Sequence, residues 1–273
     1  MTDTKLEDLQ HLLVKFDGPV CRITINRPKA LNALNAEVLQ ELETVLFRHM
    51  DPASTRVVVL EGGGDRAFVA GADITAMQSM SSADAKEFAR HGQMITRALE
   101  SLTQVTVAKV QGFALGGGCE LAMACDIVVA SKSARFGQPE VNLGIIPGFG
   151  GTQRLIRRVG MHVAMDMLLC GKSRSLTGED AHKLGLVSRV VDDAKLEEEV
   201  QKVIQGVLGA GPNAVAETKR LARDAYSMSL DAGLNAEART KSAKLPMACA
   251  RITRRSSTGF NHLESPFDGS MLK

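Results

Sequence analysis

Three consecutive glycines, Gly116–Gly118, lie between a strand-like run and a helix-like run, and Glu120 follows two residues later. Glycine permits positive φ and lets the backbone approach a ligand closely. The free N–H groups at the start of a helix can also receive negative charge. The pattern therefore has three explanations: a site for a phosphate, a site for a developing oxyanion, or a tight turn that serves packing alone.

A second acidic residue, Glu140, directly precedes another glycine-rich loop, residues 144–152. Taken singly, Glu120 is compatible with capping by a carboxylate in the first helical turn, and Glu140 with a solvated surface. Two carboxylates beside an oxyanion site would instead suit general acid–base chemistry on a polarised carbonyl.

The sequence lacks the motifs that several other kinds of site require. The phosphate-binding Gly-x-x-x-x-Gly-Lys-Ser/Thr motif is absent, and Leu121 stands where a dinucleotide fingerprint needs a glycine. No Gly-x-Ser-x-Gly elbow occurs, which removes the main support for an α/β-hydrolase. Cys119 and Cys125 have no metal-ligand spacing, and the six histidines are dispersed. We therefore expect no metal site.

Composition places the chain among ordinary globular proteins, with 44% hydrophobic and 23% charged residues in 273. The net charge is +2, and aromatic residues make up 4% with no tryptophan, so nucleic acid and membrane surfaces are poor candidate partners. Five scattered cysteines indicate reduced thiols. With no signal-peptide or transit-peptide pattern, we expect a soluble, cytoplasmic protein.

The elements expected to position these residues alternate in type over the first 130 residues, which indicates an α/β class. The expected strands are residues 12–16, 20–26, 56–60, 105–110 and 127–130, with helices at 36–50 and 83–101. Beyond residue 150 the pattern is mainly helical, and a strand is expected at 186–191. The helices expected there are 151–158, 161–170, 177–184, 194–208, 213–226 and 229–249. We divide the chain into a core, residues 1–195, and a helical C-terminal region with a tail, residues 196–273.

Five motifs in order make the chain resemble the enoyl-CoA hydratase/isomerase (crotonase) family over about residues 10–250. They are residues 27–34, 67–74, 112–120, 136–140 with 146–155, and 184–187. The resemblance implies the family's fold, an α/β spiral of ββα units followed by a helical region that builds trimers, often paired into hexamers. A homotrimer or hexamer is therefore expected.

The resemblance also implies the chemistry of a thioester enolate held by two backbone N–H groups, which by position are those of Ala72 and Gly117. Glu120 would activate a water that attacks C3, and Glu140 would supply the proton to C2, with Gly148 helping to place the water. The implied enzyme is an enoyl-CoA hydratase, a hydro-lyase of fatty-acid β-oxidation that adds water syn to a trans-2-enoyl-CoA and gives a 3-hydroxyacyl-CoA.

Coenzyme A would enter as part of the acyl-CoA substrate, with no separate cofactor. By position it would lie along Lys29, Ala30, Leu31, Ala70, Asp73, Ile74 and Thr75. Family hydratases often carry lysine where this chain has Thr75, so one phosphate contact differs. The tail at residues 258–264 also departs from the family's usual Phe-x-Glu-Lys-Arg ending, and Arg251, Arg254 or Arg255 could substitute for it.

Two alternatives stay open at this point. One is another reaction on the same fold, such as enoyl-CoA isomerisation or hydration of an aromatic or branched acyl-CoA. The other is a non-catalytic or RNA-binding protein with this fold. Glutamates at both positions favour the hydratase, because many family isomerases keep only the later one.

Overall fold

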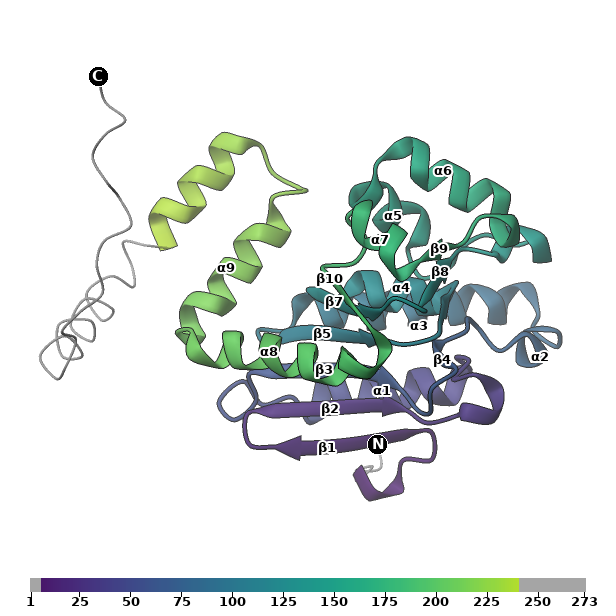
Figure 1. Cartoon of the computed structure of the whole chain (residues 1–273), viewed down its shortest axis with the longest axis horizontal. Coiled ribbons are helices and arrows are strands. Elements are labelled where there is room, and N and C mark those ends of the chain that lie inside the picture. The colour runs from purple at the N-terminus through teal and green to yellow at the C-terminus, as the bar shows by residue number, and fades with distance from the viewer. Residues whose placement is uncertain (1–5, 241–273) are drawn as a thin grey trace, which may run out of the picture. The chain divides into compact units, whose positions relative to one another are not determined.

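The computed structural model describes residues 6–240 of the chain, shown in Figure 1. The chain divides into two compact units, Met1–Arg220 and Leu221–Lys273. The first unit thus extends past the expected boundary at residue 195, because helix α8 (Leu196–Gly209) packs on the main sheet of that unit. The oligomerisation role assigned to the C-terminal region stays a prediction.

A six-stranded sheet forms the centre of the first unit, with strand order β1-β2-β3-β5-β7-β10. The first pair is an antiparallel hairpin, and the other neighbours are parallel. The strands are β1 (Leu12–Asp17), β2 (Val20–Ile25), β3 (Val57–Gly62), β5 (Val105–Val110), β7 (Ile127–Ser131) and β10 (Arg189–Val191). This confirms the α/β class that the alternating pattern indicates.

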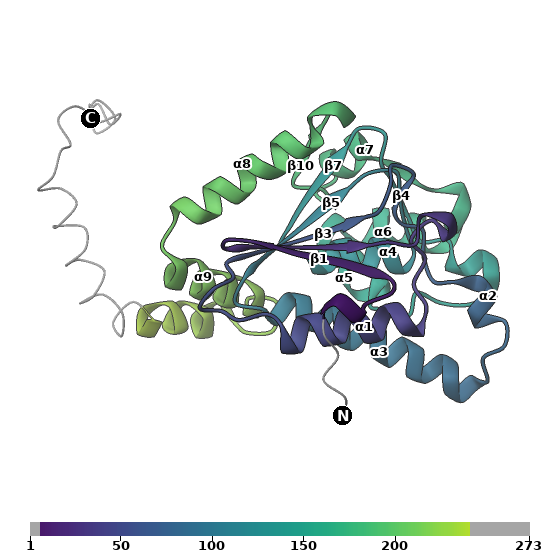
Figure 2. The same cartoon turned by 90° about the horizontal axis from the view of Figure 1, so that it is seen from below.

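Helices cover both faces of this sheet, as Figure 2 shows, with α8 on one side and α1 (Ala36–Arg48) and α3 (Ser82–Ser101) on the other. Alternate residues of a strand point to opposite faces. Val57 and Val59 accordingly pack with α8, whereas Val58 and Leu60 join the larger core cluster. Burial on both faces explains why these strands read as continuous apolar runs.

A second sheet, which the sequence reading did not include, has the order β4-β6-β8-β9. The first three strands are parallel and β9 is antiparallel to β8. Its members are β4 (Ala67–Val69), β6 (Phe113–Leu115), β8 (Arg135–Gly137) and β9 (Leu176–Thr177). Because parallel strands end at the same edge of a sheet, the segments that follow β4, β6 and β8 lie together.

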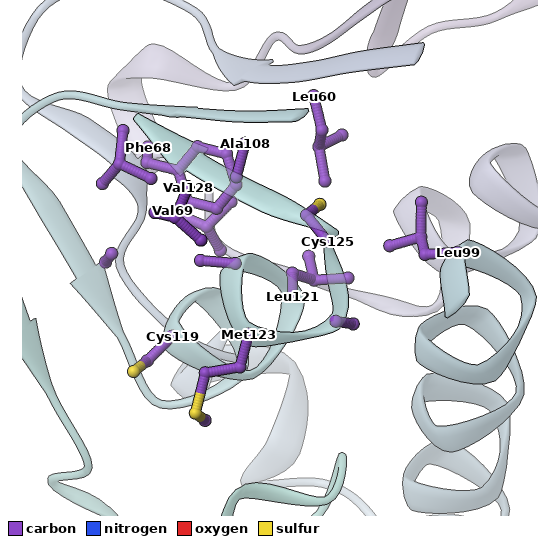
Figure 3. Close-up of a cluster of buried hydrophobic side chains, with 14 of the residues drawn as sticks. Leu60, Phe68, Val69, Leu99, Ala108, Cys119, Leu121, Met123, Cys125 and Val128 are labelled. Atoms are coloured by element: carbon purple, nitrogen blue, oxygen red, sulfur yellow. The ribbon is translucent and has the colours of Figure 1, made fainter. Parts of the chain in front are cut away.

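The buried helix α4 (Gly117–Ala124) follows β6, and every one of its residues is buried. Figure 3 shows Leu121 and Met123 of this helix in one cluster with Phe68 and Val69 of β4. A helix with apolar side chains on all its faces belongs in a protein interior, and Glu120 is the exception in α4. Packing of this kind holds the start of α4, where the glycine triplet lies, in one position.

The remaining labelled helices within residues 6–240 are one short early helix and four in the later part of the chain. They are α2 (Ile74–Met77), α5 (Gly151–Val159), α6 (Met161–Cys170), α7 (Gly178–Lys183) and α9 (Pro212–Asp224), with short 3₁₀ turns at Leu6–Asp8, Pro28–Ala30, Glu140–Leu143, Gly171–Ser173 and Asp193–Lys195. In the second unit, residues 230–240 are helical. Residues 241–249 of the expected last helix, and the tail with Arg251, Arg254 and Arg255, lie outside the described residues.

One expected strand is shorter than the sequence indicates. The run at 186–191 begins as a strand only at Arg189, because the N–H groups of Leu186 and Val187 both donate to Ala181 O and close the end of α7. Gly185, at φ +85°, supplies the left-handed residue that such a helix end needs.

Two further findings concern the described residues as a set. None of the helices within residues 6–240 is long and apolar enough to cross a membrane. The four cysteines in that range, Cys21, Cys119, Cys125 and Cys170, are all free thiols.

Candidate active site

Glu120 lies in the first turn of α4 and is 1% exposed. Its Oε1 accepts hydrogen bonds from Phe149 N at 2.9 Å and Gly151 N at 2.6 Å, both in the loop that leads into α5. Both bonds go to the same carboxylate oxygen, and the Gly150 N–H between them also acts on this carboxyl group. The loop therefore holds the carboxylate mainly through Oε1.

Glu140 begins the 3₁₀ turn Glu140–Leu143 directly after β8, and it is 9% exposed. The buried amide of Gln138, with its nitrogen toward Glu140, donates to Oε1 at 2.9 Å and Oε2 at 3.1 Å. A Cβ on Gly116 would lie 2.8 Å from Glu140 Oε1. The glycine triplet thus makes room for the second carboxylate beside the start of the helix that carries the first.

Both carboxyl groups are shifted toward neutrality. Burial raises the pKa of Glu120 to about 7, against the opposing influence of the Gly151 and Phe149 N–H groups and the charge of Arg154. Burial also raises the pKa of Glu140 to about 7, and the negative charge of Glu120 adds to that effect. Two carboxylates that repel each other favour sharing a proton. Such a pair can hold one acid and one base near pH 7.

The two backbone N–H groups singled out by the sequence donate no hydrogen bond within the described part of the chain. Ala72 pairs with Leu34 in an isolated β-bridge, and the residues on either side of Ala72 make its hydrogen bonds. Leu34 N donates to Gly71 O at 2.9 Å, and Asp73 N donates to Leu34 O at 2.7 Å. The N–H of Ala72 therefore points away from that pair.

Gly117 is the first residue of α4, where a helix leaves its N–H groups unpaired. A Cβ at Gly117 would stand 3.2 Å from Leu34 Cδ1 and 3.3 Å from the Phe149 ring, so only a residue without a side chain fits comfortably. Leu34 touches both segments, pairing with Ala72 and packing on Gly117. The structure thereby brings the two expected N–H donors to the same region.

Gly148 lies in the same loop as Phe149, and its N–H likewise has no partner among residues 6–240. Helix α3 holds the loop from the other side. Gln93 Nε2 donates to Gly148 O at 2.9 Å, and Thr96 Oγ1 donates to Phe149 O at 3.2 Å. The position of this loop is thus set by two elements remote from it in sequence, α3 and α4.

The two segments expected to carry coenzyme A are joined directly, since Ala70 N donates to Leu31 O at 3.1 Å. Arg27 Nη2 reaches Asp73 Oδ2 at 2.9 Å, and Asp73 also caps α2. Among the expected contact residues, Lys29, Ile74 and Thr75 are exposed, and Ala30, Leu31, Ala70 and Asp73 are partly buried. The carboxylate of Asp73 is therefore occupied by protein partners.

Sequence reasoning missed the residues that orient the two glutamates: Gln138, Phe149, Gly151 and Arg154. Gln138 and the loop are within the quoted motifs, but nothing in residue type or spacing indicates which carboxylate each one meets. No group of three His, Cys, Asp or Glu side chains that could hold a metal occurs within residues 6–240. What the arrangement offers chemically is two buried carboxyl groups with raised pKa values and two unpaired N–H groups.

Comparison with known proteins agrees with this geometry. The family model described as enoyl-CoA hydratase/isomerase matches residues 15–254. The chain is 41% identical over 227 residues to the short-chain-enoyl-CoA hydratase of Clostridium acetobutylicum, covering 83% of this chain and 86% of the relative. It is also 41% identical over 229 residues to the crotonyl-CoA hydratase of Syntrophomonas wolfei, covering 84% and 87%.

Solved structures match the fold as well. An enoyl-CoA hydratase from Bacillus anthracis superposes with a TM-score of 0.83 at 34% identity, over 87% of this chain and 92% of that one. A putative enoyl-CoA hydratase from Thermobifida fusca in complex with CoA gives 0.83 at 29% identity, over 91% and 99%. These matches confirm the crotonase fold that the five motifs imply. The chain belongs to the enoyl-CoA hydratase/isomerase family.

Proposed function

We propose that this protein is an enoyl-CoA hydratase that adds water to trans-2-enoyl-CoA thioesters. The observation that carries the proposal is the buried pair Glu120 and Glu140, both with a pKa of about 7, beside the unpaired N–H groups of Ala72 and Gly117. A hydratase needs a base for the water and an acid for the carbon, and this pair supplies both. Relatives named short-chain-enoyl-CoA hydratase and crotonyl-CoA hydratase support the same activity.

In the proposed mechanism the pair begins with Glu120 ionised and Glu140 protonated, because the charge of Glu120 favours the neutral form of Glu140. A water held by both carboxylates and by the N–H of Gly148 attacks C3 and gives its proton to Glu120. The C2–C3 π electrons move toward the thioester carbonyl. Glu140 then transfers its proton to C2, on the same face, and a proton passing from Glu120 to Glu140 restores the pair.

The thioester oxygen carries the negative charge of the enolate between these two steps. We assign its stabilisation to the N–H groups of Ala72 and Gly117, whose dipoles are fixed by the surrounding fold and need no reorganisation. Losing one such donor costs about 100- to 1,000-fold in rate in acyl-transfer enzymes. Coenzyme A would run along Lys29–Leu31 and Ala70–Thr75 as part of the substrate, and we propose no separate cofactor.

We further propose that the protein acts as a trimer or a dimer of trimers in the cytoplasm. Light scattering of the purified full-length chain checks the first statement, and a monomer would contradict it. The location stays an expectation from the sequence, to be checked by fractionation of the cells that make the protein.

Hydration of crotonyl-CoA by the purified protein, followed as loss of enoyl-thioester absorbance, tests the activity. We expect turnover that falls sharply in Glu120→Gln and in Glu140→Gln, and that persists in Glu37→Gln, an exposed glutamate in the first turn of α1. Full activity in both site variants would refute the residue assignment. A wild-type protein that binds the thioester without hydrating it, and instead moves the double bond of a trans-3-enoyl-CoA, would refute the hydratase.

A further inference from the structure

Hydrogen bonds hold the backbone on both sides of the Phe149 α-carbon. The N–H of Phe149 donates to Glu120 Oε1, as described above, while its carbonyl oxygen accepts from Arg154 Nη1 at 2.7 Å and Thr96 Oγ1 at 3.2 Å. Phe149 O and Gly150 N–H belong to one planar peptide unit, so a group that fixes this carbonyl also fixes the direction of Gly150 N–H, which is among the backbone groups that lower the pKa of Glu120. Whatever holds Phe149 O therefore influences how the loop meets Glu120.

Arg154 is itself locked in place by Glu100 of α3. Its Nε donates to Glu100 Oε1 at 2.7 Å and its Nη2 to Oε2 at 2.8 Å, a two-bonded fork that leaves Nη1 for Phe149 O. The two side chains are 15% and 26% exposed. Bidentate pairs of this kind fix geometry as well as energy, and lysine cannot reproduce them.

The backbone between these groups is shaped to admit the guanidinium. Gly150 has φ +108°, a conformation that favours glycine, and an added Cβ there would collide with Arg154 Nη1. Glycine at this position thus lets Arg154 fold back over its own helix start and reach the Phe149 carbonyl.

Arg154 also acts on Glu120 through its charge. Burial raises the pKa of Glu120, and the positive charge of Arg154 opposes that rise. The other titratable groups around Glu120 are Glu140, the neighbouring thiol of Cys119, and Glu100, which faces Arg154. The strands β4 and β6, which also pack on α4, carry no titratable side chain within residues 67–69 and 113–115. Arg158 of α5 also reaches α4, where its Nη2 donates to Met123 O at 2.9 Å, but Arg154 is the positive group whose charge lowers the pKa of Glu120.

We propose that Arg154, held by Glu100, is a positioning residue that aligns the Phe149–Gly150 backbone on Glu120 and favours the ionised form of Glu120. The proposal rests on the hydratase function proposed above, in which Glu120 is the base. Arg154 acts through its neighbours and has no contact with the substrate in this scheme.

The pH profile of kcat/KM for crotonyl-CoA distinguishes this role from a merely structural one. Arg154→Met should move the acidic limb about one pH unit higher, since an opposite charge nearby shifts a carboxyl pKa by about 1–3 units. Arg154→Lys keeps the charge but loses the fork, so the limb should stay in place while kcat falls about tenfold with KM unchanged. Arg157→Met, which removes an exposed charge from the same helix, serves as the matched control and should match the wild type.

A direct titration separates failure of this inference from failure of the proposed function. In protein labelled with ¹³C at the glutamate carboxyls, the Glu120 signal is the one lost in Glu120→Gln, and its midpoint should rise in Arg154→Met whatever the reaction is. If Arg154→Met does not fold, Glu100→Gln frees the guanidinium from its fork and should reproduce the Arg154→Lys kinetics. The proposal would be overturned if Arg154→Met left both the Glu120 titration midpoint and the acidic limb of the kcat/KM profile unchanged. It would also be overturned if Arg154→Lys and Glu100→Gln both kept the wild-type kcat.

Discussion

Replacing Gly92 by alanine tests whether helix α3 sets the geometry of the site. Gly92 is a buried mid-helix residue, and a Cβ there would lie 2.5 Å from Phe149 Cγ and closer still to two other ring atoms. The opposite edge of the ring packs on Gly117, and the ring lies tilted against Phe88 at a centroid distance of 5.3 Å. These contacts confine the ring on three sides.

Two effects of opposite sign decide the outcome. Alanine stabilises a helix interior by about 1 kcal/mol relative to glycine, whereas overpacking a core costs about 1–3 kcal/mol. Apolar carbons pack at about 3.5–4.0 Å, so the Phe149 ring or its loop must move by about 1 Å. We expect a net loss of up to about 2 kcal/mol in the free energy of unfolding, and a kcat about 100-fold lower, because a displacement of this size misaligns the base.

The assay combines thermal unfolding with steady-state hydration of crotonyl-CoA. Gly206→Ala is the matched control, since Gly206 lies inside α8 and nothing stands within 4 Å of an added Cβ. That control should gain up to about 1 kcal/mol from helix propensity and keep full activity. If Gly92→Ala behaves like Gly206→Ala in both measurements, then α3 does not position the Phe149 loop as we infer.

Three further predictions follow from the same contacts. Glu120→Gln and Glu140→Gln should each slow hydration by about 100- to 10,000-fold, and the double variant should lose little more, because both act on one water; fully additive losses in steady-state rates would contradict this. The folded state holds protons on these glutamates up to about pH 7, whereas the unfolded chain releases them near 4.5, so the free energy of unfolding should fall as pH rises between those values. This decrease in the free energy of unfolding should reach about 3 kcal/mol per carboxylate and should be smaller in the glutamine variants. Denaturant titrations that give the same free energy of unfolding at every pH in this range would refute the prediction. Gly116→Ala should abolish most activity, because the added Cβ would meet Glu140 Oε1. The control Gly144→Ala also places alanine at a positive φ, but with open space around the added Cβ, so it should lose stability and keep its activity. Equal losses of activity in the two variants would count against the contact with Glu140.

The long elements could be predicted from the sequence because their signals are local. The strand expected at residues 105–110 has those bounds in the structure. The helix after Asn35 was expected from its apolar spacing and its cap, and Asn35 Oδ1 does accept from Val38 N at 3.0 Å. Period and capping are properties of a few neighbouring residues, so one sequence is enough to read them.

The second sheet and the inner structure of the site depend on contacts between remote segments. Strands of two or three residues, such as Leu176–Thr177, carry no periodicity, and they exist because a neighbouring strand pairs with them. The motifs located Glu120 and Glu140, but no local pattern indicates that Gln138 faces one and that Arg154 influences the other. Such relations arise only when the fold closes.

Incubation of crotonyl-CoA with the full-length protein in ¹⁸O-water, followed by mass spectrometry of the thioester, tests the central claim most directly. The account predicts a product that has gained one water, with the label in a hydroxyl group at C3, and almost no product with Glu140→Gln. Recovery of unlabelled thioester, whether unchanged or with a displaced double bond, would contradict the assignment of Glu120 and Glu140 as the acid–base pair of a hydratase.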